Sequence, residues 1–254
     1  MINFNVRLLA VFALFSISIF TSCAPETPES KAQKIIDTAI KAHGADLFDQ
    51  SIVEFDFRNR HYRSTRNGGS YVYERIFSDS TGTFHDSLSN NSFTRHHNGK
   101  LVQLTDKKKD SYSNSVNSVI YFAQLPFFLN DAAVNKTYLG TSEIKGQTYD
   151  KIKVDFNQEG GGKDFEDNFI YWFHQEKKTM DYLAYNYQTD GGGARFRVAY
   201  NVREVEGIRF ADYINLKPTE KDNLEVETFD ELYNADKLVE LSRIDSENVE
   251  VSLQ

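Results

Sequence analysis

The stretch Ile52–Arg58, with the sequence Ile-Val-Glu-Phe-Asp-Phe-Arg, decides the fold class of this chain. Its apolar residues alternate with charged ones, so an extended backbone would place them on one face and leave the other face wet. This period of two predicts a β-strand that is buried on one side. Glycine-containing turns at 67–69 and 98–99 separate further short runs of the same kind. Together these signals predict the hairpins of an antiparallel sheet.

A helix precedes this first strand. Ser30 and Gln33 have the spacing of a capping box, in which two side chains bond to the free backbone N–H groups of a helix start. Apolar residues then recur at helical spacing as far as Ile40. Gly44 is well placed as the left-handed residue that ends a helix. The sequence therefore predicts an amphipathic helix that opens at Ser30.

Residues 106–130 interrupt the strand pattern. Apolar side chains between Tyr112 and Ala123 recur at helical spacing. Pro126 cannot continue a helix, so the predicted helix ends before it. We expect a helical insertion between two groups of strands.

Strands resume after this insertion. Alternating runs between Tyr138 and Leu216 are separated by turn residues, and Thr228 with Glu231 forms a second capping box before a short amphipathic helix. The sequence shows no internal repeat and no clear domain boundary. We therefore predict one α+β domain over residues 30–254.

The first residues have the layout of a bacterial lipoprotein signal peptide. Arg7 precedes the apolar run Leu8–Phe20, which is shorter than the roughly 20 residues needed to cross a bilayer. The sequence Phe-Thr-Ser-Cys that ends at Cys23 resembles a lipobox, with phenylalanine in place of the preferred leucine. We predict a signal peptide over 1–22, a lipid anchor on Cys23 and a tether over 23–29. A secretory signal with an unmodified cysteine, or an uncleaved anchor, is the alternative.

Composition narrows the range of functions. The formal net charge is −8, whereas nucleic-acid binding needs a basic surface, so we expect no nucleic-acid partner. Aromatic residues make up 14% of the chain and favour half-buried strands. The single cysteine cannot form an internal disulfide, so the fold depends on packing alone.

No motif for catalysis, metal binding or cofactor binding is visible. The six histidines lack the spacing of a metal site, and no G-x-S-x-G motif is present. Three glycines at 191–193 precede Arg195 and Arg197, which would add positive charge if the backbone amides met an anion. A flexible hairpin connection is the alternative interpretation. We expect no metal, no cofactor and no enzymatic activity.

Residues 121–129 form the most apolar stretch beyond the signal peptide. This stretch either plugs the core or lines a hydrophobic cavity. Tyrosine suits the wet rim of a cavity, because it joins a polar tip to an apolar body. On the cavity hypothesis, the candidate ligand-binding residues are the aromatic residues of this stretch and of two later strands with one arginine: Tyr121, Phe122, Phe127, Phe128, Trp172, Tyr185, Tyr187 and Arg195.

The order of the predicted elements resembles that of the lipoprotein carriers LolA and LolB, in which a curved half-barrel wraps helices over an apolar cavity. More closely, the chain resembles an uncharacterised family of bacterial lipoproteins. The motifs that carry this resemblance span nearly all of the chain beyond the signal peptide: Ile35–Asp37, Ala42–Gly44, Phe55–Arg58, Tyr112–Val119, Gln158–Gly162, Asp181–Tyr185 and Arg209–Asn215. The resemblance implies a single curved antiparallel sheet, a half-barrel, with the N-terminal helix and the helical insertion packed on its concave face.

The resemblance also implies a function. We expect a cell-envelope lipoprotein that binds a lipid, an acyl chain or another apolar ligand in its half-barrel and contacts the membrane through Cys23. By resemblance to lipoprotein sorting, Ala24 in place of aspartate implies an anchor in the outer membrane. Whether the protein faces the periplasm or the cell surface is left undecided. Two alternatives remain, a structural or protein-interaction module with a filled core and an envelope hydrolase with an unrecognised site.

Members of such families are sometimes labelled deoxyribose-phosphate aldolases. Those aldolases are barrels of alternating parallel strands and helices, with a buried lysine that forms a Schiff base. The hairpin spacing of this chain does not fit such a barrel. The alternation of apolar and polar residues around Lys151 and Lys153 predicts that both lysines are exposed.

Overall fold

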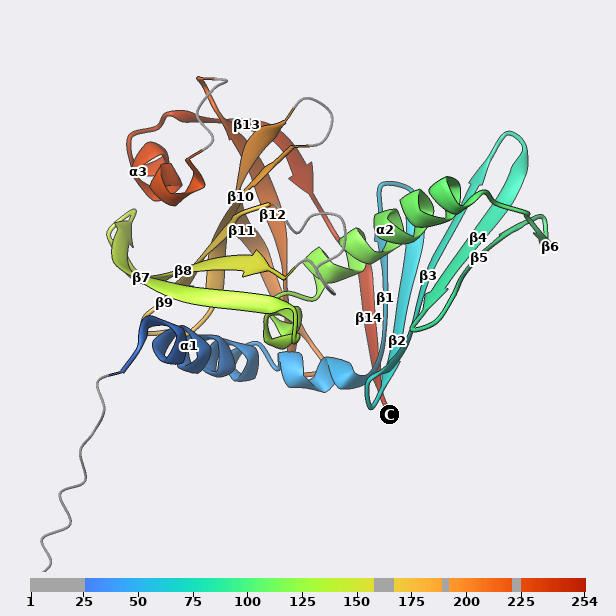
Figure 1. Cartoon of the computed structure of the whole chain (residues 1–254), viewed down its shortest axis with the longest axis horizontal. Helices are drawn as coiled ribbons and strands as arrows, with labels where there is room; N and C mark the ends of the chain where they lie inside the picture. The colour runs from blue at the N-terminus through green and yellow to red at the C-terminus, as the bar shows by residue number, and fades with distance from the viewer. Residues whose placement is uncertain (1–25, 158–166, 189–191, 221–224) are drawn as a thin grey trace, which may run out of the picture.

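The fold consists of two antiparallel sheets and the helices packed against them (Figure 1). The computed structural model describes residues 26–157, 167–188, 192–220 and 225–254. Within these ranges each sheet has seven strands, and each strand pairs antiparallel with its neighbours. The antiparallel α+β class predicted from the alternating runs is confirmed.

The first sheet, which we call sheet A, has the strand order β14-β1-β2-β3-β4-β5-β6. Apart from β14, it is a meander of consecutive hairpins, as the glycine turns predict. Its strands are β1 (Gln50–Phe57), β2 (Arg60–Asn67), β3 (Ser70–Asp79), β4 (Gly82–Ser89), β5 (Phe93–His97), β6 (Lys100–Leu101) and β14 (Glu247–Leu253).

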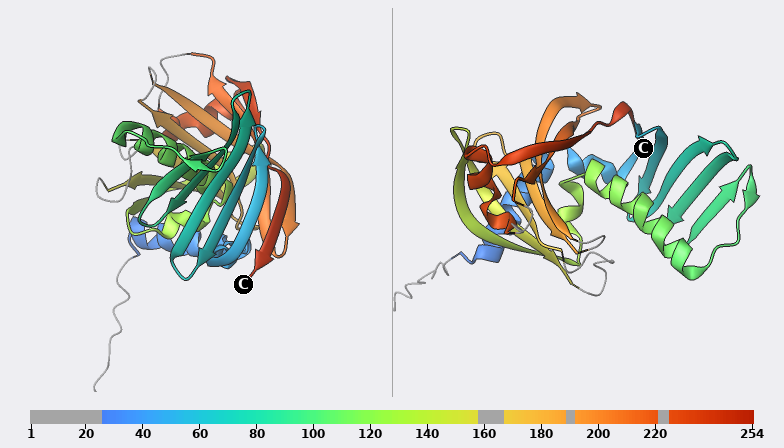
Figure 2. Two further views of the ribbon diagram at one scale, coloured as in Figure 1. Left: turned by 90° about the vertical axis from the view of Figure 1, so that its right-hand side faces the viewer. Right: turned by 90° about the horizontal axis from the view of Figure 1, so that it is seen from above.

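The second sheet, sheet B, has the order β13-β12-β11-β10-β9-β8-β7 and is also a meander. Figure 2 shows it as a strongly curved layer beside sheet A. Its strands are β7 (Val134–Ile144), β8 (Gln147–Phe156), β9 (Phe169–His174), β10 (Met180–Tyr187), β11 (Gly193–Val205), β12 (Ile208–Pro218) and β13 (Leu238–Ile244).

The curved antiparallel half-barrel expected from the resemblance is confirmed, and its strands are divided between two hydrogen-bonded sheets where one was predicted. The meander breaks where the insertion separates β6 from β7. The chain rejoins the two layers near its end, because β13 pairs with β12 in sheet B and β14 pairs with β1 in sheet A. In Figure 2 the red segment that holds these strands runs from one sheet to the other. The local period of two does not show where such a break falls.

The helices are α1 (Pro28–Ala42), α2 (Asp106–Ala123) and α3 (Phe229–Asn234), with 3₁₀ turns η1 (Ala45–Asp49), η2 (Phe127–Asn130) and η4 (Val226–Thr228). Helix α1 starts two residues before the predicted Ser30, inside the predicted tether. Its N-cap is Thr27, whose hydroxyl accepts a hydrogen bond from the Ser30 N–H at 3.1 Å. Gln33 bonds to Asp37 instead of closing a capping box.

The second predicted capping box is also absent. The Thr228 hydroxyl donates to the backbone oxygen of Glu225 at 2.9 Å and makes no cap bond to α3. Gly44, in contrast, has the predicted left-handed conformation, with φ of +60°. Helix α2 ends at Ala123, ahead of Pro126, as predicted.

One apolar core extends through both sheets. Val53 of β1, Ile120 of α2 and Tyr171 of β9 are fully buried members of the same cluster. A second, smaller cluster lies on the other face of sheet B, where α3 covers Trp172 and Phe196.

Helix α2 is fixed to sheet A by a buried charge cluster. Asp86 of β4 is fully buried and accepts hydrogen bonds from Arg75 of β3 and Arg95 of β5. Arg75 also donates to the Ser115 hydroxyl of α2 at 2.8 Å, and the Arg95 guanidinium lies 3.5 Å from the ring centroid of Tyr112. The first half of α2 is therefore held on sheet A, while its second half reaches toward sheet B.

Candidate functional site

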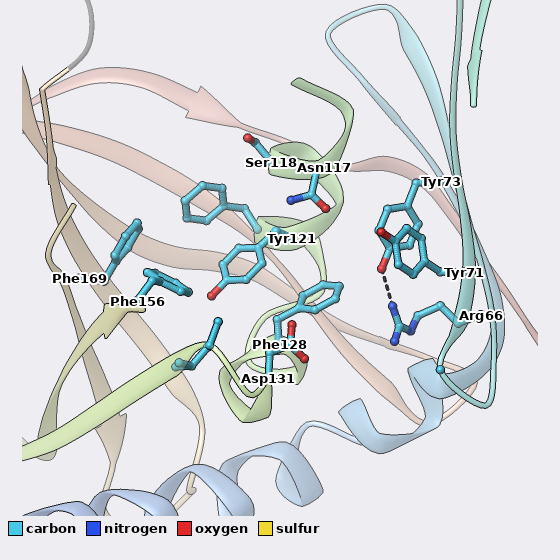
Figure 3. Close-up of a pocket in the computed structure, with 14 residues that line it drawn as sticks. Arg66, Tyr71, Tyr73, Asn117, Ser118, Tyr121, Phe128, Asp131, Phe156 and Phe169 are labelled. Atoms are coloured by element: carbon cyan, nitrogen blue, oxygen red, sulfur yellow. Dashed lines mark hydrogen bonds between the residues drawn. The ribbon is translucent and has the colours of Figure 1, made fainter. Parts of the chain in front are cut away.

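Two hollows flank the second half of α2. The first, which we call the Tyr121 pocket, has a volume of about 420 Å³ and lies between the two sheets. Figure 3 shows Tyr71, Tyr73 and Arg66 of sheet A on one side and Phe156 and Phe169 of sheet B on the other. Its wall consists of Arg66, Gly69, Tyr71, Tyr73, Asn117, Ser118, Tyr121, Phe122, Phe128, Asp131, Ala133, Val134, Phe156 and Phe169.

Stacked aromatic rings give the Tyr121 pocket its shape. The rings of Tyr121 and Phe128 are stacked with centroids 5.1 Å apart, and those of Tyr71 and Tyr73 with centroids 4.4 Å apart. Arg66 donates a hydrogen bond to the Tyr73 hydroxyl, and this pair is drawn as a dashed line in Figure 3. The pocket is thus largely aromatic, with the polar side chains of Arg66, Asn117, Ser118 and Asp131 placed among the rings.

The Tyr121 hydroxyl adds an unpaired polar group to this wall. It is buried close to the Tyr171 hydroxyl and makes no hydrogen bond of ordinary geometry with the described residues. Burial raises the pKa of this phenol well above its ordinary value of 10.0, so it stays neutral and keeps its O–H donor. A buried hydroxyl without a partner costs free energy, which a ligand acceptor would offset.

The second hollow, which we call the Arg197 pocket, lies on the other side of α2 and has a volume of about 320 Å³. Its wall combines apolar side chains of β1, α2 and β13 with polar side chains of β10, β11 and β12. The lining residues are Phe55, Phe57, Arg58, Ser118, Val119, Phe122, Ala123, Tyr185, Arg197, Ala211, Tyr213, Asn215, Ile244 and Ser246.

Phe122 and Ser118 belong to the walls of both pockets. The Phe122 ring lies 5.7 Å from the Tyr185 ring, centroid to centroid, and 4.2 Å from the Arg197 guanidinium. The turn of α2 from Ser118 to Phe122 therefore separates the two hollows. Both hollows have aromatic walls with a few polar groups, which is the usual make-up of a small-molecule site.

Comparison with known proteins identifies the family of this chain. Residues 10–246 match the model of a family described as a family of unknown function, DUF6503. The chain belongs to this family. This match confirms the resemblance to an uncharacterised family that the sequence motifs indicated. No curated protein matches this DUF6503 protein.

Solved structures resemble this DUF6503 member at very low sequence identity. A DUF1329 family protein from Desulfovibrio piger is 9% identical, with a TM-score of 0.50 over 88% of this chain and 93% of that one. A putative outer membrane lipoprotein-sorting protein domain from Vibrio parahaemolyticus is 8% identical, with a TM-score of 0.46 over 88% and 93%. A LolA superfamily protein from Nitrosomonas europaea is 8% identical, with a TM-score of 0.45 over 87% and 91%. The likeness concerns the fold alone.

The structure brings four of the predicted ligand residues of the DUF6503 chain to the pockets. Tyr121 and Phe128 line the Tyr121 pocket, Tyr185 lines the Arg197 pocket, and Phe122 lines both. Phe127 lies next to them and packs edge-on against Phe128 and Phe48. The apolar stretch 121–129 therefore both fills the core and lines a cavity.

The other predicted ligand residues lie elsewhere. Trp172 is fully buried on the opposite face of sheet B, where its indole N–H donates to Asp230 at 3.3 Å. Tyr187 and Arg195 bond to each other and belong to neither pocket wall. Cys23 lies outside the described residues.

Sequence reasoning named Arg197 only as a possible anion contact beside the glycine run, and it missed Tyr213 and Asn215 of the second pocket. Arg197, Tyr213 and Asn215 lie on β11 and β12, two strands that the alternation located correctly. The sequence pattern that pointed to this wall was the pair Arg195 and Arg197, which are two residues apart and so lie on the same face of a strand. Part of the glycine run before them, through residue 191, lies outside the described residues.

The predicted exposure of Lys151 is wrong. Its side chain is 15% exposed and its ammonium group lies 3.1 Å from the Asp230 carboxylate. Lys153 is 33% exposed and pairs with Glu227 at 2.9 Å. The short helix α3 covers this face of sheet B, which the local period does not reveal.

Within the described ranges, no group of three or more His, Cys, Asp or Glu side chains is arranged to hold a metal ion. None of the helices in the described part of the chain combines the length and the apolar character needed to span a bilayer.

Proposed function

We propose that this DUF6503 protein is a lipid-anchored protein of the cell envelope that binds an apolar or amphipathic ligand, such as a lipid or an acyl chain, beside α2. The observation that carries the proposal is the pair of aromatic hollows that share Phe122. Their volumes of about 420 and 320 Å³ fall in the range of small-molecule pockets.

The physical basis of binding is the burial of apolar surface. Each methylene group of an acyl chain that leaves water contributes about 0.8 kcal/mol. A chain that occupies both sides of Phe122 would bind without any catalytic group. For this reason we propose a binding protein rather than an enzyme.

The proposed location follows from the sequence. The apolar run that ends before Cys23 and the absence of aspartate after it support a lipid anchor in the outer membrane. An anchored protein stays beside the membrane that holds its ligand. The partner of the protein is then the membrane itself.

The experiment is native mass spectrometry of the purified lipoprotein, released from a mild detergent micelle in the gas phase. We expect an added mass of one lipid-sized molecule that organic extraction removes and that returns when lipid is supplied. If the protein carries no ligand and takes up none from a lipid mixture, the proposal fails and the interaction module with a filled core is favoured.

A further inference from the structure

Arg197 is a buried cation with no carboxylate partner. The residue is 9% exposed, and within the described ranges no aspartate or glutamate lies within ion-pair distance of its guanidinium group. The neighbouring arginines differ, since Arg203 pairs with Asp212 at 3.1 Å and Arg209 pairs with Asp181 at 3.0 Å. An isolated buried charge is costly unless something compensates it.

Most of the Arg197 donors are unused. A guanidinium group has five N–H donors in a planar fork. Only one hydrogen bond is formed by them among the described residues, from Nη2 to the Tyr185 hydroxyl at 2.9 Å, and Nε is buried without an acceptor. The rings of Phe122 and Tyr185 flank the group at 4.2 and 5.0 Å. These rings hold the cation in place without satisfying its donors.

Asn215 presents a second unsatisfied group on the same wall. Its side chain is buried, Nδ2 donates to the Ser242 hydroxyl at 3.1 Å, and Oδ1 has no partner among the described residues. The amide can be turned over, because the Ser242 hydroxyl donates as well as it accepts. The Asn215 N–H₂ group then points where the oxygen now lies, next to Arg197 on the pocket wall.

Much of the rest of the wall is apolar, and its remaining polar residues are Arg58, which is exposed, Ser118, Tyr213 and Ser246. Val119 and Ala123 of α2 and Phe55 of β1 line the same hollow. Arg197 and Asn215 thus offer a positive fork and an amide, while α2 and β1 offer hydrocarbon contacts. This is the chemistry of an amphipathic molecule with one anionic head.

We propose that the Arg197 pocket binds the carboxylate head of a fatty acid, whose chain runs from Phe122 along α2. The inference rests on the proposed function and specifies its ligand class. A planar carboxylate matches the guanidinium fork with two parallel hydrogen bonds. Arg58 also lines this pocket but is exposed, so Arg197 supplies its buried positive charge, which matches the single charge of a carboxylate better than the charge of about −1.5 to −2 of a phosphate monoester at pH 7.

The test uses three clickable hexadecyl probes with the same photoreactive chain and different heads: a carboxylate, an alcohol and a phosphate. The full-length lipoprotein in mild detergent is irradiated with each probe, and labelled peptides are quantified by mass spectrometry. We expect the carboxylate probe to label peptides of α2 and β12 at least about tenfold more than the alcohol. Stronger labelling by the phosphate would overturn the assignment to a carboxylate.

The matched variants are Arg197→Met and Arg195→Met, which remove one charge each from the same strand. We expect Arg197→Met to reduce labelling by the carboxylate probe to the level of the alcohol probe, and Arg195→Met to leave the ratio unchanged. Arg197→Lys keeps the charge without the fork and should restore only part of the preference.

Thermal unfolding separates a binding role of Arg197 from a structural one. Removing a buried, unpaired charge should leave the Tm of the ligand-free Arg197→Met variant unchanged or raise it. A Tm lowered by this variant, or an unchanged carboxylate preference, overturns the inference. If acid and alcohol label the pocket equally, only the inference fails; if no probe labels the protein, the proposed function fails too.

Discussion

The imidazole Nε2 of His43 accepts a hydrogen bond from the backbone N–H of Met180 at a distance of 3.0 Å. This bond joins the end of α1 to the start of β10, and the backbone oxygen of His43 also accepts from the N–H of Arg209 at 2.8 Å. His43 is 2% exposed, and burial, with a smaller effect of the Arg209 charge, lowers its pKa from 6.5 to about 3. The ring is therefore neutral in the folded protein at neutral pH.

The first prediction concerns pH. The unfolded chain binds a proton at His43 near pH 6.5, whereas the folded chain does not until about pH 3, so stability falls as the pH drops through this window. This one group should contribute a slope of up to about 1.4 kcal/mol per pH unit. Urea unfolding at pH 7.5, 6.0 and 5.0 measures how the free energy of unfolding changes with pH. His43→Gln, which retains an acceptor for Met180, should have a shallower slope, and an equal slope in both proteins would contradict the assignment.

The second prediction concerns Gly44. A Cβ atom there would lie 1.9 Å from the backbone oxygen of Gly207, and φ is +60°. Gly68 is the matched control, because its φ is +56° and nothing lies within 4 Å of the added atom. We expect Gly68→Ala to lower the free energy of unfolding by about 1 kcal/mol, from backbone strain alone. Gly44→Ala should cost at least about 2 kcal/mol more in chemical denaturation, and equal costs would contradict the close approach of these loops.

The third prediction concerns Asp86. Replacing it with asparagine leaves Arg75 and Arg95 as buried charges without a counter-ion. Breaking a buried ion pair in this way costs about 3–5 kcal/mol. Asp236→Asn is the control, since Asp236 is 88% exposed and pairs with Lys145 at 3.0 Å, so its loss should change stability by less than about 1 kcal/mol. Urea denaturation of both variants decides the matter, and similar losses would disprove the role of the cluster.

The fourth prediction distinguishes the two pockets. Ala123 lines only the Arg197 pocket and Ala133 lines only the Tyr121 pocket. If the head of the ligand sits at Arg197, the added ring of Ala123→Phe should weaken binding of a fluorescent fatty acid by at least about tenfold. Ala133→Phe should weaken it less. Fluorescence titration of both variants tests this order, and a reversed order would place the head in the Tyr121 pocket.

The fifth prediction concerns the anchor. Cys23→Ser removes the only thiol that can carry lipid. We expect the variant to lose labelling by a clickable fatty-acid precursor in growing cells, while wild-type protein is labelled and fractionates with the outer membrane. Labelling that persists in the variant would show that the lipid is attached elsewhere or not covalently.

The sequence predicted most elements of the fold, because local patterns define them. The alternation in β1, the glycine turns and the helical spacing in α2 depend on neighbours only a few residues apart. The two capping boxes failed because a favourable spacing does not determine which group bonds the free N–H. At α1 the Thr27 hydroxyl takes this role three residues before the predicted one.

The candidate site was only partly predictable. The stretch 121–129 was recognised by its apolar character, and it does line a cavity. Alternation showed that Arg195 and Arg197 share a face of β11, but it could not show which of the two lines a pocket. Packing of α2 against sheet B leaves Arg197 in a pocket and leaves Arg195 bonded to Tyr187.

The sequence by itself determined the antiparallel hairpins and the main helices, since each depends on short-range periodicity. Only the tertiary structure decided that Val53 of β1 pairs with Val251 of β14. It also decided that the meander divides into two sheets and that α2 lies between two hollows. These features depend on contacts between residues far apart in the chain, where many pairings satisfy the same period of two and close packing selects one.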